Sequence, residues 1–275
     1  MQEFSSSTFR PTHPLPEVIA DGYALITGGS SGLGLEFARQ LASQRINLVL
    51  VARGEQRLRE AARDIESEFS VKVETISADL ADHAALEPIK ERLLATENPV
   101  TILVNNAGAG LYSSMITTDF SQIRSAAEVM GLAPMELGGV AASAMSERHR
   151  GLIINVASVS ALVPMGAYSA IKALVRTWSD SLAVKLAGSG VHVVTCMPGW
   201  VRTEFHARTG VSNDSLPSWV WLTPDRVVAE TLDGAARGKM SVTPSKRFKV
   251  ISFLAVHAPG AAVRKAVVKL NKGRR

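Results

Sequence analysis

Six short apolar runs alternate with helix-like segments along most of the chain, and this alternation constrains the fold more than any other feature. The runs are GYALIT (22–27), NLVLV (47–51), VKVETI (71–76), TILVNN (101–106), GLIINVA (151–157) and VHVVTC (191–196), with KMSVTP (239–244) as a candidate seventh. Segments between them, such as LGLEFARQLASQ and EQRLREAARDIESEF, repeat apolar residues at helical spacing. Continuous apolar strands separated by helices predict a parallel sheet that is covered on both faces. We therefore expect a single doubly wound α/β domain over residues 21–245, with six or seven parallel strands and helices on both faces.

The two ends of the chain depart from this pattern. Residues 1–20 hold serines and prolines without the apolar run of a signal peptide, so we predict a flexible arm. Residues 246–275 contain nine Lys or Arg and no acidic residue. Two interpretations of this basic tail stay open: an amphipathic surface for peripheral contact with anionic lipid, or a terminal helix that docks on the domain with solvated lysines.

The composition excludes several classes of protein. Apolar residues make up 46% of the chain, enough for a buried core, yet no stretch reaches the roughly 20 uninterrupted apolar residues of a membrane span. The basic residues lack interleaved aromatics, which argues against a nucleic-acid partner. Cys196 is the only cysteine and lies in the apolar run VHVVTCM, so we expect a buried, reduced thiol and a cytoplasmic protein.

A glycine-rich loop, TGGSSGLG (27–34), follows the first apolar run directly and leads into a helix. Glycines at 28, 32 and 34 supply a tight turn, a close backbone approach to a ligand and close packing of the helix on the strand. The helix N-terminus then faces a pyrophosphate, because its free N–H groups attract anions. The loop predicts a nucleotide site in a Rossmann-type domain.

The residues after the second run indicate which dinucleotide binds. An acidic side chain about 20 positions beyond the glycine loop would bind the ribose 2′-hydroxyl of NAD. The run ends instead with Ala52 and Arg53. A guanidinium matches a 2′-phosphate in charge and geometry, which favours NADP, although a surface arginine opening the next helix is the alternative. Asp79, after the third run, either meets the adenine or caps the following helix, and both interpretations stay open.

The segment YSAIK (168–172) places a tyrosine and a lysine on one face of a helix, because residues four apart are neighbours there. A tyrosine with a pKa near 10 is a poor acid or base at neutral pH. A neighbouring ammonium favours the phenolate, so we expect Lys172 to lower the pKa of Tyr168 toward the range useful for proton transfer. The alternative is a half-buried Tyr168 beside a solvated Lys172.

Four motifs in order, TGGSSGLG, NNAG (105–108), YSAIK and PGWVRTEF (198–205), resemble the short-chain dehydrogenase/reductase family over residues 22 to about 245. The segments NLVLVAR and WLTPDRV resemble its NADP-linked reductases. The resemblance implies hydride transfer between NADP(H) and a small carbonyl or secondary alcohol substrate, with Tyr168 as the acid and base. It also implies a homodimer or homotetramer formed through the amphipathic segments near 119–148 and 166–187.

The resemblance assigns roles to individual residues and implies no metal. Ser158 holds the substrate oxygen, Lys172 also holds the nicotinamide ribose, and Asn105 supports the sheet. The cofactor-binding residues that it implies are Gly28, Ser30, Ser31, Gly32, Leu33, Gly34, Arg53, Asp79, Leu80, Asn106, Ala107, Gly108, Tyr168, Lys172, Pro198, Gly199, Val201 and Thr203.

Two positions depart from the family pattern. Met130 occupies the place where the family has an asparagine that positions a water linking the lysine to solvent, and a thioether cannot replace an amide in that role. Ser158 precedes Tyr168 by only 10 residues, a shorter separation than the family commonly shows, so Ser160 stays open as an alternative serine. These departures support an alternative function, an NADP(H)-binding sensor or scaffold with impaired turnover.

The segment HARTGVSNDSLPSWVWL (206–222) carries Leu216, Trp219 and Trp221. Either it covers the substrate pocket and favours an apolar or bulky substrate, or its tryptophans dock on the core.

Overall fold

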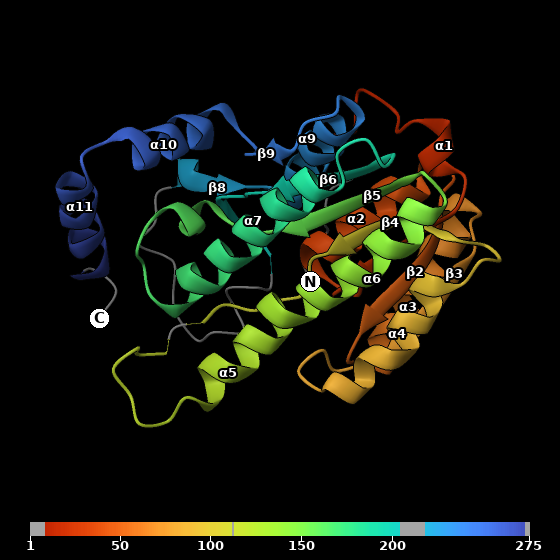
Figure 1. The fold of residues 1–275 in the computed structure, drawn as a ribbon, viewed down its shortest axis with the longest axis horizontal. Coiled ribbons are helices and arrows are strands. Elements are labelled where there is room, and N and C mark those ends of the chain that lie inside the picture. The colour runs from red at the N-terminus through yellow and green to blue at the C-terminus, as the bar shows by residue number, and fades with distance from the viewer. Residues whose placement is uncertain (1–8, 112, 204–217, 273–275) are drawn as a thin grey trace.

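A seven-stranded parallel sheet forms the centre of the molecule (Figure 1). This computed structural model describes residues 9–111, 113–203 and 218–272. Within them the strand order is β3-β2-β1-β4-β5-β6-β9, which confirms the predicted doubly wound sheet. The strands are β1 (Tyr23–Thr27), β2 (Asn47–Ala52), β3 (Val73–Ser77), β4 (Val100–Asn105), β5 (Gly151–Val156), β6 (Val191–Cys196) and β9 (Ser241–Val242).

Two layers of helices cover the sheet because side chains alternate between its faces. On β1, Ala24 and Ile26 pack in one apolar cluster, whereas Tyr23 and Leu25 pack in the other. The first cluster lies under α2 (Gly32–Ala42), α3 (Glu55–Phe69) and α9 (Pro224–Ala236). The second lies under α4 (Glu87–Leu94), α6 (Ala133–Glu147) and the end of α7 (Ala167–Lys185).

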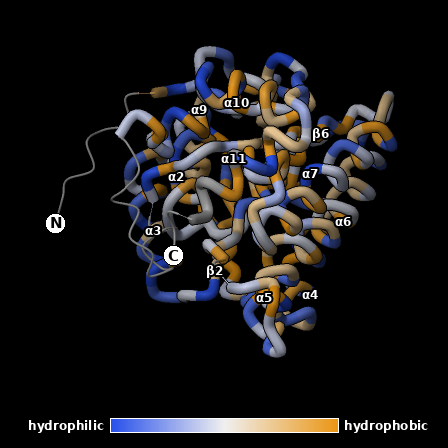
Figure 2. Tube along the Cα trace, turned by 90° about the vertical axis from the view of Figure 1, so that its left-hand side faces the viewer, coloured by the Kyte–Doolittle hydropathy of each residue, from blue (hydrophilic) through white to orange (hydrophobic). Residues whose placement is uncertain are grey.

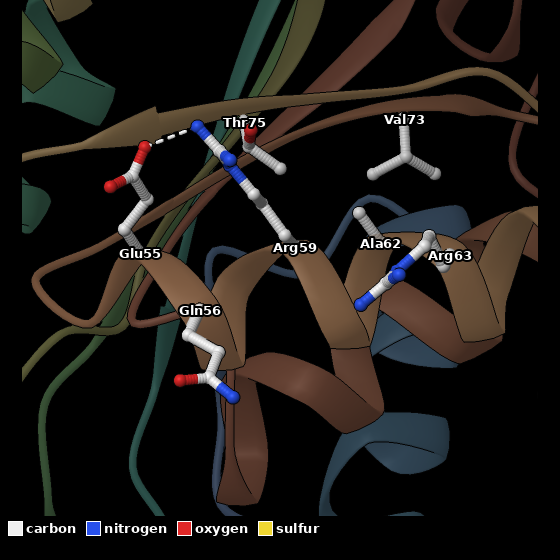
Figure 3. Close-up of a pocket in the computed structure, with 7 residues that line it drawn as sticks. All are labelled: Glu55, Gln56, Arg59, Ala62, Arg63, Val73 and Thr75. Atoms are coloured by element: carbon white, nitrogen blue, oxygen red, sulfur yellow. Dashed lines mark hydrogen bonds and ion pairs between the residues drawn. The ribbon is translucent and has the colours of Figure 1, made fainter.

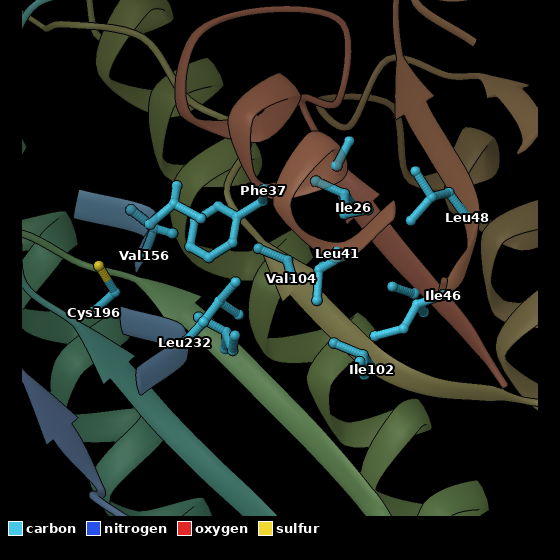
Figure 4. Packing of buried hydrophobic residues seen from close by; sticks show 14 of the residues in the cluster. Ile26, Phe37, Leu41, Ile46, Leu48, Ile102, Val104, Val156, Cys196 and Leu232 are labelled. Carbon is cyan, nitrogen blue, oxygen red and sulfur yellow. The ribbon is translucent and has the colours of Figure 1, made fainter. Parts of the chain in front are cut away.

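The first cluster is the larger of the two and has Phe37 of α2 near its centre (Figure 4). Phe37, Leu41 and Ile26 are each fully buried. Cys196 lies in the same cluster as a buried free thiol, as the apolar run around it predicts. Its Sγ lies 3.1 Å from the Thr231 hydroxyl of α9, so the thiol is held by a polar contact inside the core.

The shorter elements connect and extend this core. They are α1 (Glu17–Ala20), η1 (His83–Leu86), α5 (Ser121–Ala127), the π-helical turn η2 (Glu128–Leu132), η3 (Val159–Leu162), β7 (Trp200–Val201), η4 (Ser218–Val220), β8 (Trp221–Leu222), α10 (Lys246–His257) and α11 (Gly260–Lys272). Strands β7 and β8 pair with each other. Most of the predicted pocket cover, residues 206–217 with Leu216, lies outside the described residues.

The N-terminal arm is docked, not free, over its described part, and residues 1–8 lie outside that part. The Phe9 and Thr12 backbone N–H groups donate to carboxylates of α9, at 3.0 Å to Asp225 and 2.7 Å to Asp233. Leu15 is only 5% exposed and packs in the first cluster. The prediction of a flexible arm is therefore wrong for residues 9–20, because its anchors lie more than 200 positions away in the sequence.

The C-terminal residues form two helices, α10 and α11, at the opposite end of the molecule from β3 (Figure 1). Among the described residues, no helix combines the length and the apolar character needed to cross a bilayer.

The strand order reverses between β1 and β4, since the chain winds outward from this pair in both directions. In open α/β sheets ligands bind at the carboxyl ends of the strands beside such a reversal. The ends of β1, β4, β5 and β6 therefore define where the site is built.

Candidate active site

The glycine loop after β1 adopts a conformation that only glycine takes without strain. Gly28 and Gly32 have φ angles of +68° and +55°, in the left-handed region that disfavours other residues. A Cβ on Gly34 would lie 2.2 Å from the Gly28 carbonyl oxygen. Helix α2 therefore begins in close contact with the loop, with its first N–H groups at the end of β1.

A set of hydrogen bonds joins the ends of β1 and β4 beside this loop. The Thr27 hydroxyl accepts from the backbone N–H groups of Asn106 and Ala107, each at 3.0 Å. The Asn106 side-chain amide donates to the Thr27 carbonyl at 2.9 Å. We call these contacts the Thr27–Asn106 clasp. Sequence reasoning missed Thr27, although its position at the end of the first strand was visible.

Arg53 is the first residue after β2, at the same edge of the sheet as the glycine loop. Its side chain is 71% exposed, and its guanidinium lies 3.7 Å from the Asp79 carboxylate. Asp79 also accepts from the Ala81 backbone N–H at 3.1 Å and so closes a turn. The next helix, η1, is capped by Asp82, so the expectation that Asp79 caps that helix is wrong. Leu80, expected at the cofactor, is 7% exposed and packs its side chain in the second cluster.

Lys172 and Tyr168 lie in the first turns of α7. Lys172 is 4% exposed, and its ammonium donates to the Val156 carbonyl at the end of β5 at 2.8 Å. The same nitrogen lies 5.8 Å from the centre of the half-buried Tyr168 ring. Burial away from water lowers the pKa of Lys172 to about 8. The alternative of a solvated lysine is therefore wrong, and the two side chains are neighbours.

Two serines compete for the substrate position, and their surroundings differ. Ser158, at the end of β5, accepts from the Ser160 backbone N–H at 3.1 Å and donates to the Pro198 carbonyl at 3.5 Å. Its hydroxyl thus lies between the loops after β5 and β6. The Ser160 hydroxyl is buried and has no hydrogen-bond partner among the described residues. The short loop between Ser158 and Tyr168 is taken up by the turn η3.

The loop after β6 closes the opposite side of the crevice. The Thr203 side chain lies 3.3 Å from where a Cβ on Gly32 would be, so this loop reaches the glycine loop. Val201 is 6% exposed and packs in the first cluster. A Cβ on Gly199 would lie 2.2 Å from the Phe248 ring of α10. The C-terminal helix therefore packs directly on the loop that holds Pro198 and Thr203.

Met130 lies in the π-helical turn η2, between α5 and α6, and is 2% exposed. Its sulfur lies 3.0 Å from where a Cβ on Gly108 would be, so the thioether packs against the NNAG segment. Pro134 has no N–H and cannot close an α-helical bond to the Met130 carbonyl, which favours the wider turn at this place. Pro134 is the sequence signal from which this turn is predictable.

A buried polar chain lies below the site. The Asn105 amide donates to the Asn155 side chain at 2.9 Å and to the Pro134 carbonyl at 3.1 Å, and Asn155 donates to Ser179 of α7 at 2.9 Å. These bonds tie β4 and β5 to α6 and to α7, the helix that carries Tyr168 and Lys172. This arrangement matches the supporting role that the resemblance assigned to Asn105.

One surface hollow, of about 510 Å³, lies between α3 and β3, outside the site (Figure 3). Arg59 pairs with Glu55 across its rim. The residues that line it are Glu55, Gln56, Arg59, Ala62, Arg63, Val73 and Thr75, and none of them belongs to the predicted site.

A model of the short chain dehydrogenase family matches residues 22–213, the span that holds the glycine loop, the clasp and the Tyr168–Lys172 pair. The chain belongs to the short chain dehydrogenase family. A very-long-chain 3-oxoacyl-CoA reductase of Kluyveromyces lactis is 32% identical over 225 residues, or 78% of this chain and 63% of that protein. This chain spans about three fifths of the length of such curated relatives.

Solved structures of the family share the architecture. A short-chain dehydrogenase from Sphingobium yanoikuyae in complex with NADPH has a TM-score of 0.77 and 30% identity, covering 84% of this chain and 92% of that one. A bulky-bulky ketone specific alcohol dehydrogenase from Comamonas testosteroni has a TM-score of 0.74 and 28% identity, covering 84% and 91%.

Replacing Gly34 by alanine tests the contact between α2 and the glycine loop. The new methyl group meets the Gly28 carbonyl, so we expect the free energy of unfolding to fall by about 1–3 kcal/mol and dinucleotide binding to weaken. Urea unfolding and calorimetry measure both. Gly139→Ala is the matched control, because a Cβ there meets nothing within 4 Å. Equal behaviour of the two variants would contradict the contact.

The burial of Lys172 predicts a pH-dependent stability. The folded state releases the Lys172 proton at a pKa of about 8, below the ordinary value of 10.5. The unfolded chain therefore binds more protons between these values, and stability rises with pH in that window. Relative to Lys172→Met, we expect the parent to gain about 3 kcal/mol in free energy of unfolding between pH 8 and pH 10.5.

Urea unfolding at a series of pH values measures this difference. Comparing the parent with Lys172→Met also cancels the contribution of the buried Cys196 thiol. Burial raises the pKa of Cys196 to about 12, which acts in the opposite direction but is present in both proteins. A difference between parent and Lys172→Met that stays constant with pH would show that Lys172 is solvated when folded.

Proposed function

We propose that this chain is an NADP(H)-dependent oxidoreductase that reduces a carbonyl compound or oxidises the matching secondary alcohol. The observation that carries the proposal is the buried Lys172 ammonium beside the Tyr168 ring, at the carboxyl ends of β5 and β6. A buried charge is costly unless it is paired or hydrogen-bonded. The fold keeps the Lys172 ammonium next to the Tyr168 phenol, in the crevice where ligands bind in open α/β sheets.

The residues at the strand ends fit a dinucleotide with a 2′-phosphate. The Gly28–Gly34 contact holds the glycine loop against the start of α2, whose first N–H groups suit a pyrophosphate. The exposed Arg53 guanidinium, which lies 3.7 Å from the Asp79 carboxylate, suits the 2′-phosphate. Thr203 lies beside the glycine loop and suits the carboxamide end. When bound, the reduced nicotinamide supplies hydride to the carbonyl carbon. The related Sphingobium protein was solved with NADPH, which supports the same choice here.

The chain's own residues handle the proton and the substrate oxygen. Tyr168 donates its phenolic proton to the oxygen, and the Lys172 ammonium stabilises the phenolate that remains. Lys172 also has donors left, after its bond to the Val156 carbonyl, for the ribose hydroxyls. The Ser158 hydroxyl accepts from the Ser160 backbone N–H and donates a long bond to the Pro198 carbonyl, at 3.5 Å. Its proton is therefore available to orient the substrate oxygen.

An apolar, bulky substrate fits the surroundings best. Trp219 is 56% exposed, whereas its neighbours Val220 and Leu222 are buried. The indole therefore does not dock on the core and is free to cover an apolar ligand. Relatives named as very-long-chain 3-oxoacyl-CoA reductases and as a bulky ketone alcohol dehydrogenase support this class.

Replacing Tyr168 by phenylalanine tests the proton donor. We expect NADPH oxidation with bulky ketones to fall by about 10²- to 10⁴-fold, with NADPH binding retained, because the ring still packs beside Lys172. Absorbance at the reduced nicotinamide band and calorimetry measure the two quantities. Tyr23→Phe, at a buried tyrosine of β1, controls for loss of a hydroxyl. A Tyr168→Phe protein that reduces ketones as fast as the parent would end the proposal.

A second candidate function, an NADP(H)-binding sensor or scaffold with impaired turnover, rests on Met130. The buried thioether packs on Gly108 where an amide could hold a water, and the Lys172 ammonium donates to Val156. A protein of this kind would bind NADPH tightly and oxidise it at no measurable rate with any ketone.

Met130→Asn separates the two candidates. We expect the parent to turn over and the variant to raise kcat by on the order of tenfold, because a positioned amide restores proton transfer to solvent. Steady-state kinetics with NADPH and with NADH measure the effect. Met135→Asn, half-buried on α6, controls for an added amide. An inactive parent with an active Met130→Asn variant would favour the sensor.

A further inference from the structure

Helix α10 exposes an unusual concentration of large apolar side chains. Val250, Ile251, Phe253, Leu254 and Val256 occupy five of seven consecutive positions and are 42% to 60% exposed. Val268 of α11 is 55% exposed. We call these six side chains the α10–α11 surface. Large exposed apolar groupings of this kind mark contact with another apolar phase.

One side chain of α10 is buried, and it fixes where the surface lies. Phe248 is 2% exposed, covers Gly199, and has its ring 6.1 Å from that of Trp200. The helix also contacts η3, the turn that follows Ser158. The α10–α11 surface is therefore attached to the two loops that flank the crevice.

Hydrophilic residues alternate with apolar ones along α10 and α11 (Figure 2). Lys246, Arg247 and Lys249 lie in the first turn of α10, and Arg264 and Lys265 lie on α11, all of them exposed. Residues 246–275 contain no acidic residue. A second copy of this surface would bring like charges together, whereas an anionic bilayer complements both its charge and its apolar residues.

We propose that the α10–α11 surface docks on bilayers that contain anionic lipid, with α10 in the interfacial plane. Apolar side chains insert between headgroups while lysines and arginines meet the lipid phosphates. Because Phe248 ties α10 to Gly199, docking brings the mouth of the crevice to the lipid surface. The docking itself does not depend on the proposed function, and only the delivery of an apolar carbonyl substrate from the bilayer rests on it.

The test is co-sedimentation of the full chain with vesicles of phosphatidylcholine, alone or mixed with phosphatidylglycerol. We expect binding to the mixed vesicles, weaker binding at higher salt, and little binding to phosphatidylcholine alone. Phe253→Glu with Leu254→Glu should abolish the binding. Lys249→Glu with Lys265→Glu should lower the partition constant by on the order of tenfold or more. Retained NADPH binding shows that the variants fold.

Ile116→Glu with Val184→Glu is the matched control, since both positions are exposed apolar residues outside α10 and α11, at 96% and 70%. It should bind vesicles like the parent. Equal binding to both lipid compositions, or binding that the α10 variants leave unchanged, would overturn the proposal. So would a parent that ignores vesicles but forms a dimer that Phe253→Glu with Leu254→Glu dissociates in sedimentation velocity runs.

Discussion

The Thr27–Asn106 clasp is the contact on which the site depends. It joins β1 to β4 at the point where the strand order reverses, and it uses backbone groups that would otherwise end their strands unpaired. With these two strand ends fixed, Gly28 and Gly34 can meet. The loops after β5 and β6 are held from the other side by Ser158 and Pro198. A crevice open at one edge of the sheet follows from these bonds.

Lys172 shows how the core supports the chemistry. Its ammonium is held by the Val156 carbonyl of β5 and interacts with Cys196 of β6. Desolvation makes the charge less favourable and lowers the pKa. The same loss of water strengthens the interaction of that charge with a nearby phenol. An exposed lysine would be more stable as a cation, but it would act on Tyr168 through water and with less effect.

The sequence predicted the strands well because most of them are apolar runs with a turn at the end, although the edge strand β3 is largely exposed. It also predicted the glycine loop, where backbone geometry itself requires glycine at positions 28 and 32. It could not predict the docked arm, because Asp225 and Asp233 come together with residues 9–12 only after the sheet has formed. The sequence did not predict the burial of Lys172 for the same reason. Helical spacing shows which face of the helix carries Lys172, but not which residues of the sheet pack against that face.

The C-terminal helices connect the site to the outer surface of the molecule. Gly199 has no side chain, and the Phe248 ring occupies the space that a Cβ would need. This contact and the one between α10 and η3 set the position of α10, and thereby of its exposed apolar and basic residues, relative to Pro198 and Thr203. Because Phe248 packs on Gly199, a ligand or membrane that moves α10 also moves the loop after β6. The packing of Phe248 on Gly199 thus explains the glycine at this position, and it also places the exposed surface of α10 beside the mouth of the crevice.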